Sequence, residues 1–372
     1  MNDTHLYSVA LNLIDKVGGV KARQLISYCG SAEAVFKTSR QKLLKIPLVG
    51  EKIAHLILQK DILQEAEAEV KRAIRQNVKI VTVTDADYPV RLKQYPDAPF
   101  VFYLRGEVAF NTDKTIAIVG TRAATDYGRN FTEELVRALM PYKPLVVSGL
   151  AYGIDIAAHQ ASLKYGLPTV GVMASGIDVV YPSSHMATAR QMVKQAGGIM
   201  TEARFGTEPD ARKFPARNRI IAGLADATVV VEAKESGGAL ITANIANDYN
   251  KDVFAVPGDI QRKTSAGCNN LIKQHKAHLI TSAKDIAYIM NWDLDGKTKA
   301  TQQSLLFNTM PTDKNEQKIV KLLQTQPEQT LGLDDLSWQL KMPLSKLSAY
   351  LLNLEIHGYL KSLPGKKFML LV

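Results

Sequence analysis

The sequence predicts an α/β protein whose centre is a Rossmann-like, doubly wound and mainly parallel sheet, with a helical domain before it and a winged-helix domain after it. Two observations predict the central sheet. From Lys114 onward, short runs of β-branched residues alternate with amphipathic helical stretches, an order typical of βαβ units. The runs are apolar throughout, as in strands that are buried on both faces.

The length of the chain favours several domains, because one hydrophobic core rarely organises as many as 372 residues. Changes in composition divide the chain into four parts. We expect a helical domain, an extended connector with the Rossmann-like domain, a linker, and a winged-helix-like domain, over residues 1–70, 71–290, 291–314 and 315–372.

The composition favours a polyanionic partner and a reducing compartment. The net charge is +10, which is common in proteins that bind nucleic acid. No stretch approaches the roughly 18 apolar residues of a membrane span, and the start lacks the pattern of a secretory signal. Cys29 and Cys268 form no redox or metal motif. We therefore expect a cytoplasmic protein without a membrane partner.

The helical stretches of residues 1–70 are separated by glycine-containing breaks at 17–20 and 46–50. The second break looks like the turn of a helix-hairpin-helix (SAM-like) domain, in which a glycine lets backbone amides approach a phosphate. Basic and acidic residues nearly cancel here. Protein contacts and DNA binding both remain open for this domain.

The connector begins with a helix over 65–77 and continues into an extended segment. Pro89, Pro96 and Pro99 exclude a regular helix there, so we expect the segment to lie extended across the next domain. The strands of that domain are expected at 115–120, 145–149, 169–174, 198–203, 227–233, 252–258 and 278–282. Helices such as 128–140 and 155–166 supply the crossovers.

The last part of the chain has the order of a winged helix. Residues 291–314 are polar and aperiodic, as in a linker. Three helical stretches and a short hairpin follow, with 346–356 in the position of a recognition helix and Lys366 and Lys367 in the wing. The domain is only slightly basic, so DNA reading and protein interaction both remain open.

Two glycine turns follow predicted strands, at 119–122 and 148–155. Helix N-termini at such turns leave backbone amides free for an anion, most simply a phosphate, although the glycines alone would also allow tight packing. No P-loop occurs, and the second turn is GxxxG rather than the dinucleotide fingerprint GxGxxG. We therefore expect no nucleotide cofactor.

The segment 204–223 is the most informative part of the sequence. It holds five basic residues against two acidic ones, with Phe205 and Phe214 among the cations. Sequence-tolerant binding of a single strand needs cations along the backbone and aromatic rings on which bases stack. In the alternative interpretation, Phe214 belongs to the core and Arg219 to a buried ion pair. A further strand–glycine–helix unit at 235–243 could hold another phosphate.

These segments together resemble the DNA-processing protein A (DprA/Smf) family. The resemblance covers roughly 80–290 in order, and its most specific string is FPARNRIIAGL at 214–224. It implies a protein without catalytic activity that forms a homodimer and binds single-stranded DNA. It also implies that the protein protects incoming DNA and loads RecA recombinase during natural transformation and homologous recombination. The motifs assign no residue to the dimer or RecA surfaces. The other matching segments are 119–122, 148–159, 175–185, 229–243, 253–258 and 267–272.

The resemblance also implies the residues of the site. Phe214 would stack on a base, and the phosphates would be held by Arg122, Ser148, Gly149, Lys213, Arg217, Asn218, Ser236, Gly237 and Gly238. One position departs from the pattern, because His185 stands where many relatives have Asn in YPxxN. Both side chains form hydrogen bonds, so the departure concerns only that loop.

The main alternative is a nucleotide-processing hydrolase in which Asp155, His159, Asp178 or Glu232 acts as acid or base. The sequence places no base beside a nucleophile, and a carboxylate at a helix start also complements the dipole. No catalytic residue is therefore expected.

A metal site and a purely structural role are weaker alternatives. His275 and His278 are three residues apart, but no cluster completes a ligand set, so no metal is expected. An adaptor without a DNA site would leave the basic, aromatic segment without a function.

Overall fold

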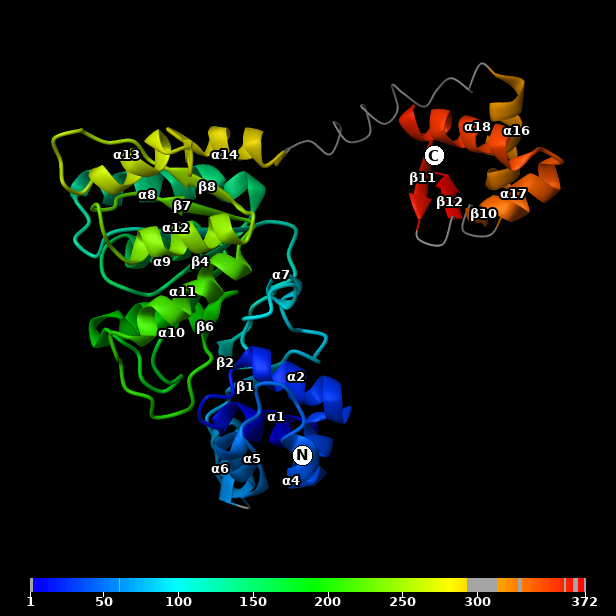
Figure 1. Cartoon of the computed structure of the whole chain (residues 1–372). Coiled ribbons are helices and arrows are strands. Elements are labelled where there is room, and N and C mark those ends of the chain that lie inside the picture. Colours follow the sequence, from blue (N-terminus) through cyan, green and yellow to red (C-terminus); the bar gives the residue numbers. More distant parts are fainter. Residues whose placement is uncertain are drawn as a thin grey trace. The chain divides into compact units, whose positions relative to one another are not determined.

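The computed structural model describes residues 3–59, 61–292, 313–326, 330–357, 359–363 and 367–370. The chain forms two compact units, Met1–Trp292 and Asp293–Val372, and each is described by itself (Figure 1).

The first unit contains a nine-stranded sheet in the order β1-β2-β6-β5-β4-β3-β7-β8-β9. All pairs from β6 through β9 are parallel, whereas β1 pairs antiparallel with β2, and β2 with β6. The predicted Rossmann-like, mainly parallel sheet is confirmed. The strands are β1 (Lys79–Thr82), β2 (Val101–Gly106), β3 (Thr115–Val119), β4 (Leu145–Ser148), β5 (Thr169–Val172), β6 (Gly198–Thr201), β7 (Ala227–Val230), β8 (Asp252–Ala255) and β9 (His278–Leu279).

Helices cover both faces of this sheet. Successive side chains of a strand point to opposite faces, and β3 follows this rule: Ile116 packs in one core cluster with helices α8, α9 and α14, while Ala117 packs in another with α11, α12 and α13. The helices are α8 (Asp126–Leu139), α9 (Ile154–Lys164), α10 (Met186–Lys194), α11 (Lys213–Leu224), α12 (Gly238–Asp248), α13 (Ala266–Lys273) and α14 (Ala283–Ile289).

The direction of winding reverses at β3. The chain adds β4, β5 and β6 on one side of β3 and then returns to add β7, β8 and β9 on the other. The carboxyl ends of β3 and β7 therefore lie side by side, while the helices that follow them diverge. In open α/β sheets, this switch point is where ligands bind.

The segment expected as an extended connector is part of the sheet. Its residues form β1 and β2, separated by the short helix α7 (Val90–Lys93), which was not predicted. The prolines lie between the two strands, so neither strand loses a hydrogen-bond donor. Pro89 precedes α7 as its N-cap, a position that needs no backbone N–H.

The helical front packs directly against this end of the sheet (Figure 1). Its buried Val9, Leu25 and Ile57 share one core cluster with Tyr103 and Met173 of the α/β part. The expected breaks precede α2 and α5, which begin after Gly18 and Gly50. The helices are α1 (Asp3–Leu13), α2 (Gly19–Cys29), α3 (Ala32–Lys37), α4 (Arg40–Leu43), α5 (Glu51–Leu58) and α6 (Asp61–Arg75).

The second unit is a winged helix, as predicted. Its core joins Ile319, Leu336 and Leu351, and its sheet has the antiparallel order β10-β12-β11. The predicted recognition segment lies in α18, Lys367 begins β12, and Lys366 and most of the expected linker lie outside the described residues. The elements are α16 (Lys314–Gln324), β10 (Thr330–Gly332), α17 (Leu333–Leu340), α18 (Leu344–Ile356), β11 (Leu360–Leu363) and β12 (Lys367–Leu370).

Among the described helices, none combines the length and the apolar character that crossing a membrane requires.

Candidate nucleic-acid interface

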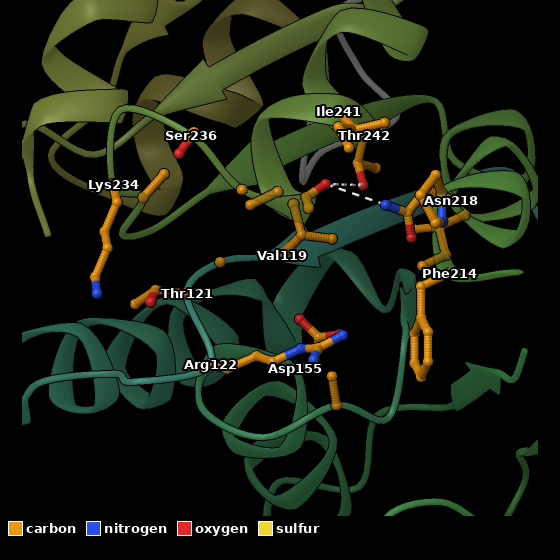
Figure 2. Close-up of a pocket in the computed structure, with 18 of the residues that line it drawn as sticks. Val119, Thr121, Arg122, Asp155, Phe214, Asn218, Lys234, Ser236, Ile241 and Thr242 are labelled. Carbon is orange, nitrogen blue, oxygen red and sulfur yellow. Dashed lines mark hydrogen bonds between the residues drawn. The ribbon is translucent and has the colours of Figure 1, made fainter. Parts of the chain in front are cut away.

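A pocket of about 410 Å³ lies at the switch point of the sheet (Figure 2). Four segments line it: the turn after β3, the turn from β4 into α9, the start of α11, and the loop from β7 into α12. They bring together seven of the predicted site residues, with Arg217 at the floor. The predicted residues in the lining are Arg122, Phe214, Arg217, Asn218, Ser236, Gly237 and Gly238.

The two predicted glycine turns meet at the base of this pocket. Gly153 precedes α9 with φ +80°, and a Cβ there would lie 2.1 Å from the carbonyl oxygen of Thr121. Gly120 is equally tight, because its Cβ would lie 2.4 Å from Ile154. Only glycine therefore allows the turn after β3 to contact the start of α9.

Arg122 and Phe214 form the open side of the pocket. The Arg122 guanidinium carbon lies 4.9 Å from the centroid of the Phe214 ring, and that of Arg217 lies 5.7 Å from it. Arg122 is exposed and forms no hydrogen bond or ion pair with any residue that the structure describes. Its N–H donors are thus available to an anion, next to a half-buried ring.

The opposite wall is the start of α12. The carbonyl of Gly238 accepts hydrogen bonds from Asn218 Nδ2 and Thr242 Oγ1, both at 3.1 Å (dashed in Figure 2). Gly237 and Ser236 are exposed, and no side chain caps the helix. The first amides of α12 are therefore free to bind an anion.

A buried charged pair lies beneath the ring. Arg217 Nη1 donates to the carbonyls of Gly149, at 2.7 Å, and Val172, while Asp155 accepts from the Gly149 amide at 3.1 Å. Burial lowers the pKa of Arg217 to about 10, which still leaves it charged at neutral pH. Burial also raises the pKa of Asp155, and the Arg217 charge opposes that rise.

Three residues expected to contact phosphate are therefore engaged inside the protein. Arg217 is 5% exposed and braces the turn after β4. Ser148 is fully buried and donates to the carbonyl of Ile118 at 2.6 Å, and the Gly149 amide is bonded to Asp155. The sequence does not reveal which polar groups the interior uses. We leave these three out of the proposed interface.

Lys213 lies outside the pocket, on a neighbouring groove of about 710 Å³. That groove runs between the turn after α1 and the ends of β5 and β6, and Arg217 lines both cavities. Lys213 is exposed at the start of α11. A strand that leaves the pocket along α11 would pass this side chain.

Two other members of the basic segment, Phe205 and Arg219, have structural roles. Phe205 is buried, with its ring edge-on to Tyr103 at 5.5 Å and the Arg72 guanidinium above it at 4.9 Å. Arg219 forms an ion pair with Glu202. Of the two aromatic rings, only Phe214 thus faces the pocket.

The candidate acids and bases of a hydrolase are also occupied. Glu232 is buried and accepts from the amide and hydroxyl of Thr125, at 2.9 and 2.7 Å, which caps α8. His159 Nδ1 lies 2.7 Å from Thr169 Oγ1, and burial lowers the pKa of His159 to about 3. Neither side chain lines the pocket.

The remaining candidates give no catalytic or metal centre. Asp178 accepts from Arg72, at 2.8 Å, and from the Gly206 amide, at 2.9 Å, and so joins the helical front to the loop after β6. His275 has a left-handed backbone, and His278 lies 3.5 Å from Asp252. The described residues contain no group of three or more side chains able to hold a metal ion.

His185, the departure from the family pattern, supports the turn after β4. Its Nδ1 donates to the carbonyl of Leu150 at 2.8 Å, and Leu150 is in the left-handed conformation, with φ +55°. The donor stabilises a backbone conformation that is costly for leucine.

Sequence reasoning missed several pocket residues. Thr121, Lys234, Ile241 and Thr242 line the pocket, and Tyr181 lies with its ring centroid 6.2 Å from that of Phe214. Lys234 follows a strand end, as ligand-binding residues of this fold often do, which was an available signal. Tyr181 had no such signal, because its loop meets α11 only in three dimensions.

The fold and the pocket define a Rossmann-like α/β protein with a pocket at the switch point of its sheet and a C-terminal winged helix. The family model "DNA recombination-mediator protein A" matches residues 79–291, and the model "DprA winged helix domain" matches 307–366. The chain belongs to the DNA recombination-mediator protein A family. The resemblance stated from the motifs is thus confirmed.

Relatives match over most of the chain. It is 29% identical to Protein Smf from Synechocystis sp., over 99% of both chains. It is 38% identical to DNA processing protein DprA from Streptococcus pneumoniae, over 55% of this chain and 72% of that one. The name of the Streptococcus protein describes DNA processing.

Two solved structures are similar in fold. DprA from Streptococcus pneumoniae has a TM-score of 0.61 and 29% identity, over 77% of this chain and 98% of that one. DprA from Helicobacter pylori has a TM-score of 0.52 and 26% identity, over 57% and 95%. The latter structure concerns the single-stranded DNA binding mode of the Helicobacter protein.

Proposed function

We propose that this protein binds single-stranded DNA at the switch-point pocket and takes part in DNA processing during natural transformation and homologous recombination. The observation that carries the proposal is the exposed, unpaired Arg122 above the ring of Phe214. Cation and ring side by side are the two elements that sequence-tolerant binding of a single strand needs.

The roles of the residues follow from their positions. Arg122, the exposed Lys234 and the first amides of α12 would bind phosphates, with Ser236 as a further donor at the rim. A base would stack in the layer formed by Phe214 and the Arg122 guanidinium. Asn218 would keep the start of α12 in place through its bond to Gly238. Lys213 would contact the strand beyond the pocket.

Further parts of the proposal rest on family membership. We propose that the protein acts as a homodimer in the cytoplasm, protects the bound strand and loads RecA recombinase onto it. Cys29 and Cys268 are free thiols, in keeping with a reducing compartment. The exposed partner surfaces are left without assigned residues.

The test is a fluorescence-anisotropy titration of labelled oligothymidylate at several salt concentrations, with duplex DNA as competitor. We expect a preference for the single strand and a log–log salt slope of about −0.7 per phosphate contacted. Arg122→Ala should weaken binding by about 10- to 100-fold and flatten the slope. Phe214→Ala should weaken binding with little change in slope.

Arg137→Ala is the matched control, because Arg137 is an exposed arginine in the last turn of α8, away from the pocket. It should bind as the wild type does. A preference for duplex DNA, or Arg122→Ala binding as tightly as Arg137→Ala, would overturn the proposal. RecA loading is tested separately, as the rate at which RecA displaces single-strand-binding protein from DNA with and without this protein.

A further inference from the structure

Two exposed tyrosines lie near the pocket, where only Phe214 was expected: Tyr181 packs beside Phe214, and Tyr152 follows Ala151, which lines the pocket. Tyr181 is 47% exposed and Tyr152 is 49% exposed. The Tyr181 ring lies 6.2 Å from the Phe214 ring, with an angle of 64° between the planes. Tyr181 comes from the loop after β5 and Phe214 from the start of α11, so only the tertiary structure brings these two rings together.

Tyr152 is held beside the turn that carries Arg122. The next residue, Gly153, packs so closely on that turn that a Cβ would lie 2.7 Å from the carbonyl carbon of Arg122. On its other side, the Tyr152 ring lies edge-on to the His185 ring at 5.0 Å. The Ser184 hydroxyl lies 3.5 Å from the Tyr152 hydroxyl. The position of the ring is thus fixed while half of its surface remains open.

Tyr181 is also presented outward by its surroundings. The following Pro182 is buried and precedes the short 3-10 helix Ser183–His185, whose Ser183 and Ser184 are exposed. Among the described residues, the Tyr181 hydroxyl has no hydrogen-bond partner. A large ring that is half exposed and makes no polar contact contributes little to the fold, which leaves its open face available to a ligand.

We infer that Tyr181 and Tyr152 form a second base-stacking site, which receives the nucleotides next to those bound at Arg122 and Phe214. The inference rests on the proposed function and extends it along the strand. Bases stack on aromatic faces whatever their identity, and a tyrosine loses little conformational entropy on binding. The exposed hydroxyls of Ser183 and Ser184 follow Tyr181 in the chain, and that of Ser184 lies 3.5 Å from the Tyr152 hydroxyl. They supply donors to the backbone of the strand.

The experiment compares oligothymidylate with an abasic oligomer of the same length and charge. Stacking requires the base, whereas phosphate contacts do not. Tyr181→Ala and Tyr152→Ala should each weaken oligothymidylate binding by about fivefold or more, the loss expected for one stacked base. Neither variant should alter abasic binding or the salt slope. Tyr181→Phe should bind as the wild type does, because it keeps the ring.

Tyr28→Ala is the matched control, since Tyr28 is a 62% exposed tyrosine of α2. Tyr28→Ala should change neither the affinity for oligothymidylate nor the affinity for the abasic oligomer. Thermal unfolding of each variant accompanies the titrations, because the Tyr152 ring contacts His185, and Tyr181→Ala tests the inference without that contact.

The outcomes separate this inference from the proposed function. Tyrosine variants that bind oligothymidylate like the wild type, while Arg122→Ala and Phe214→Ala lose affinity, overturn the second site alone. Equal losses on both oligomers also overturn it, since the rings would then act on the shape of the loops or on another partner. A wild-type protein that binds no single strand overturns both.

Discussion

The switch-point pocket and helix α18 are the two regions from which DNA contact could be expected, and their side chains differ in kind. The pocket combines an exposed arginine that has no hydrogen bond or ion pair among the described residues, an exposed lysine and an aromatic ring. The exposed side of α18 instead carries Leu344, Leu352 and Ile356, which are 46%, 58% and 72% exposed. Lys346 is its one exposed basic residue within the described helix.

This difference teaches that topology and chemistry have to be considered separately. A recognition helix reads DNA with Arg, Lys, Asn or Gln directed at base edges and phosphates. The winged helix of this protein has the right order of elements, but its α18 exposes three large apolar side chains and one basic residue. Of the two uses left open by the sequence, α18 favours protein interaction, while the pocket has the chemistry of a nucleic-acid site.

The largest effect is expected from Gly153→Ala, which disrupts the close packing of the two turns at the base of the pocket. A side chain at Gly153 collides with the Thr121 carbonyl and strains a backbone with φ +80°, at a cost of about 2–4 kcal/mol. Thermal unfolding and anisotropy should report lower stability and weaker binding of single-stranded DNA.

Gly166→Ala is the control for the backbone conformation alone. Gly166 has φ +71° with no atom within 4 Å of its added Cβ, so we expect a loss of only about 1 kcal/mol and unchanged DNA binding. If both variants behave alike, close packing of the two turns does not shape the pocket.

The next largest effect is expected from acid, which should lower the folding stability of the first unit through the buried His159. Thr169 donates to the carbonyl of Val146, so His159 Nδ1 donates to Thr169 and its buried Nε2 lacks a partner. Because the folded pKa of His159 is lowered to about 3 from 6.5, the unfolded chain binds more protons between these values. Stability is therefore lost as pH falls below 6.5.

The contribution of His159 should amount to about 1.5 kcal/mol between pH 6.5 and pH 5. It is measured by denaturant titration at both values. His159→Asn keeps a donor near Thr169 and does not titrate, so its stability should fall less over this range. An unchanged pH dependence in His159→Asn would contradict the assignment.

Lys234→Ala tests how much the exposed lysine at the rim of the pocket contributes to DNA binding. An exposed lysine acts mainly through phosphate charge, so we expect affinity to fall by about threefold at low salt and the slope to lose about one contact. Lys273→Ala, at the exposed end of α13, serves as the control in the same anisotropy titration. Equal effects of the two variants would assign the loss to net charge alone.

The smallest effect is expected from the winged helix. Lys346→Ala removes the exposed base of α18 and should leave single-strand affinity within about twofold, because no phosphate contact is lost. A loss as large as that of Lys234→Ala would return α18 to the DNA-binding surface.

Much of the fold could be predicted from the sequence, because strands that are buried on both faces of a sheet consist of continuous apolar runs. The expected strands from 115 onward all occur, and the glycine turns mark their ends. The strands β1 and β2 were missed because the segment between them contains prolines, which mask local strand patterns. Antiparallel pairing of β2 with β6 depends on residues about a hundred positions apart.

For the site, three features could be predicted from the sequence alone. They are the glycine turns at strand ends, a basic segment with aromatic residues, and the family membership that the motifs indicate. The tertiary structure alone decided their use. Arg217 and Arg122 are both arginines beside Phe214, yet one is buried against the Gly149 carbonyl and the other is open to solvent. Tyr181 and Tyr152 join them only through packing. The physical reason is that hydrogen-bond partners and solvent exposure depend on contacts between distant segments, which local sequence does not encode.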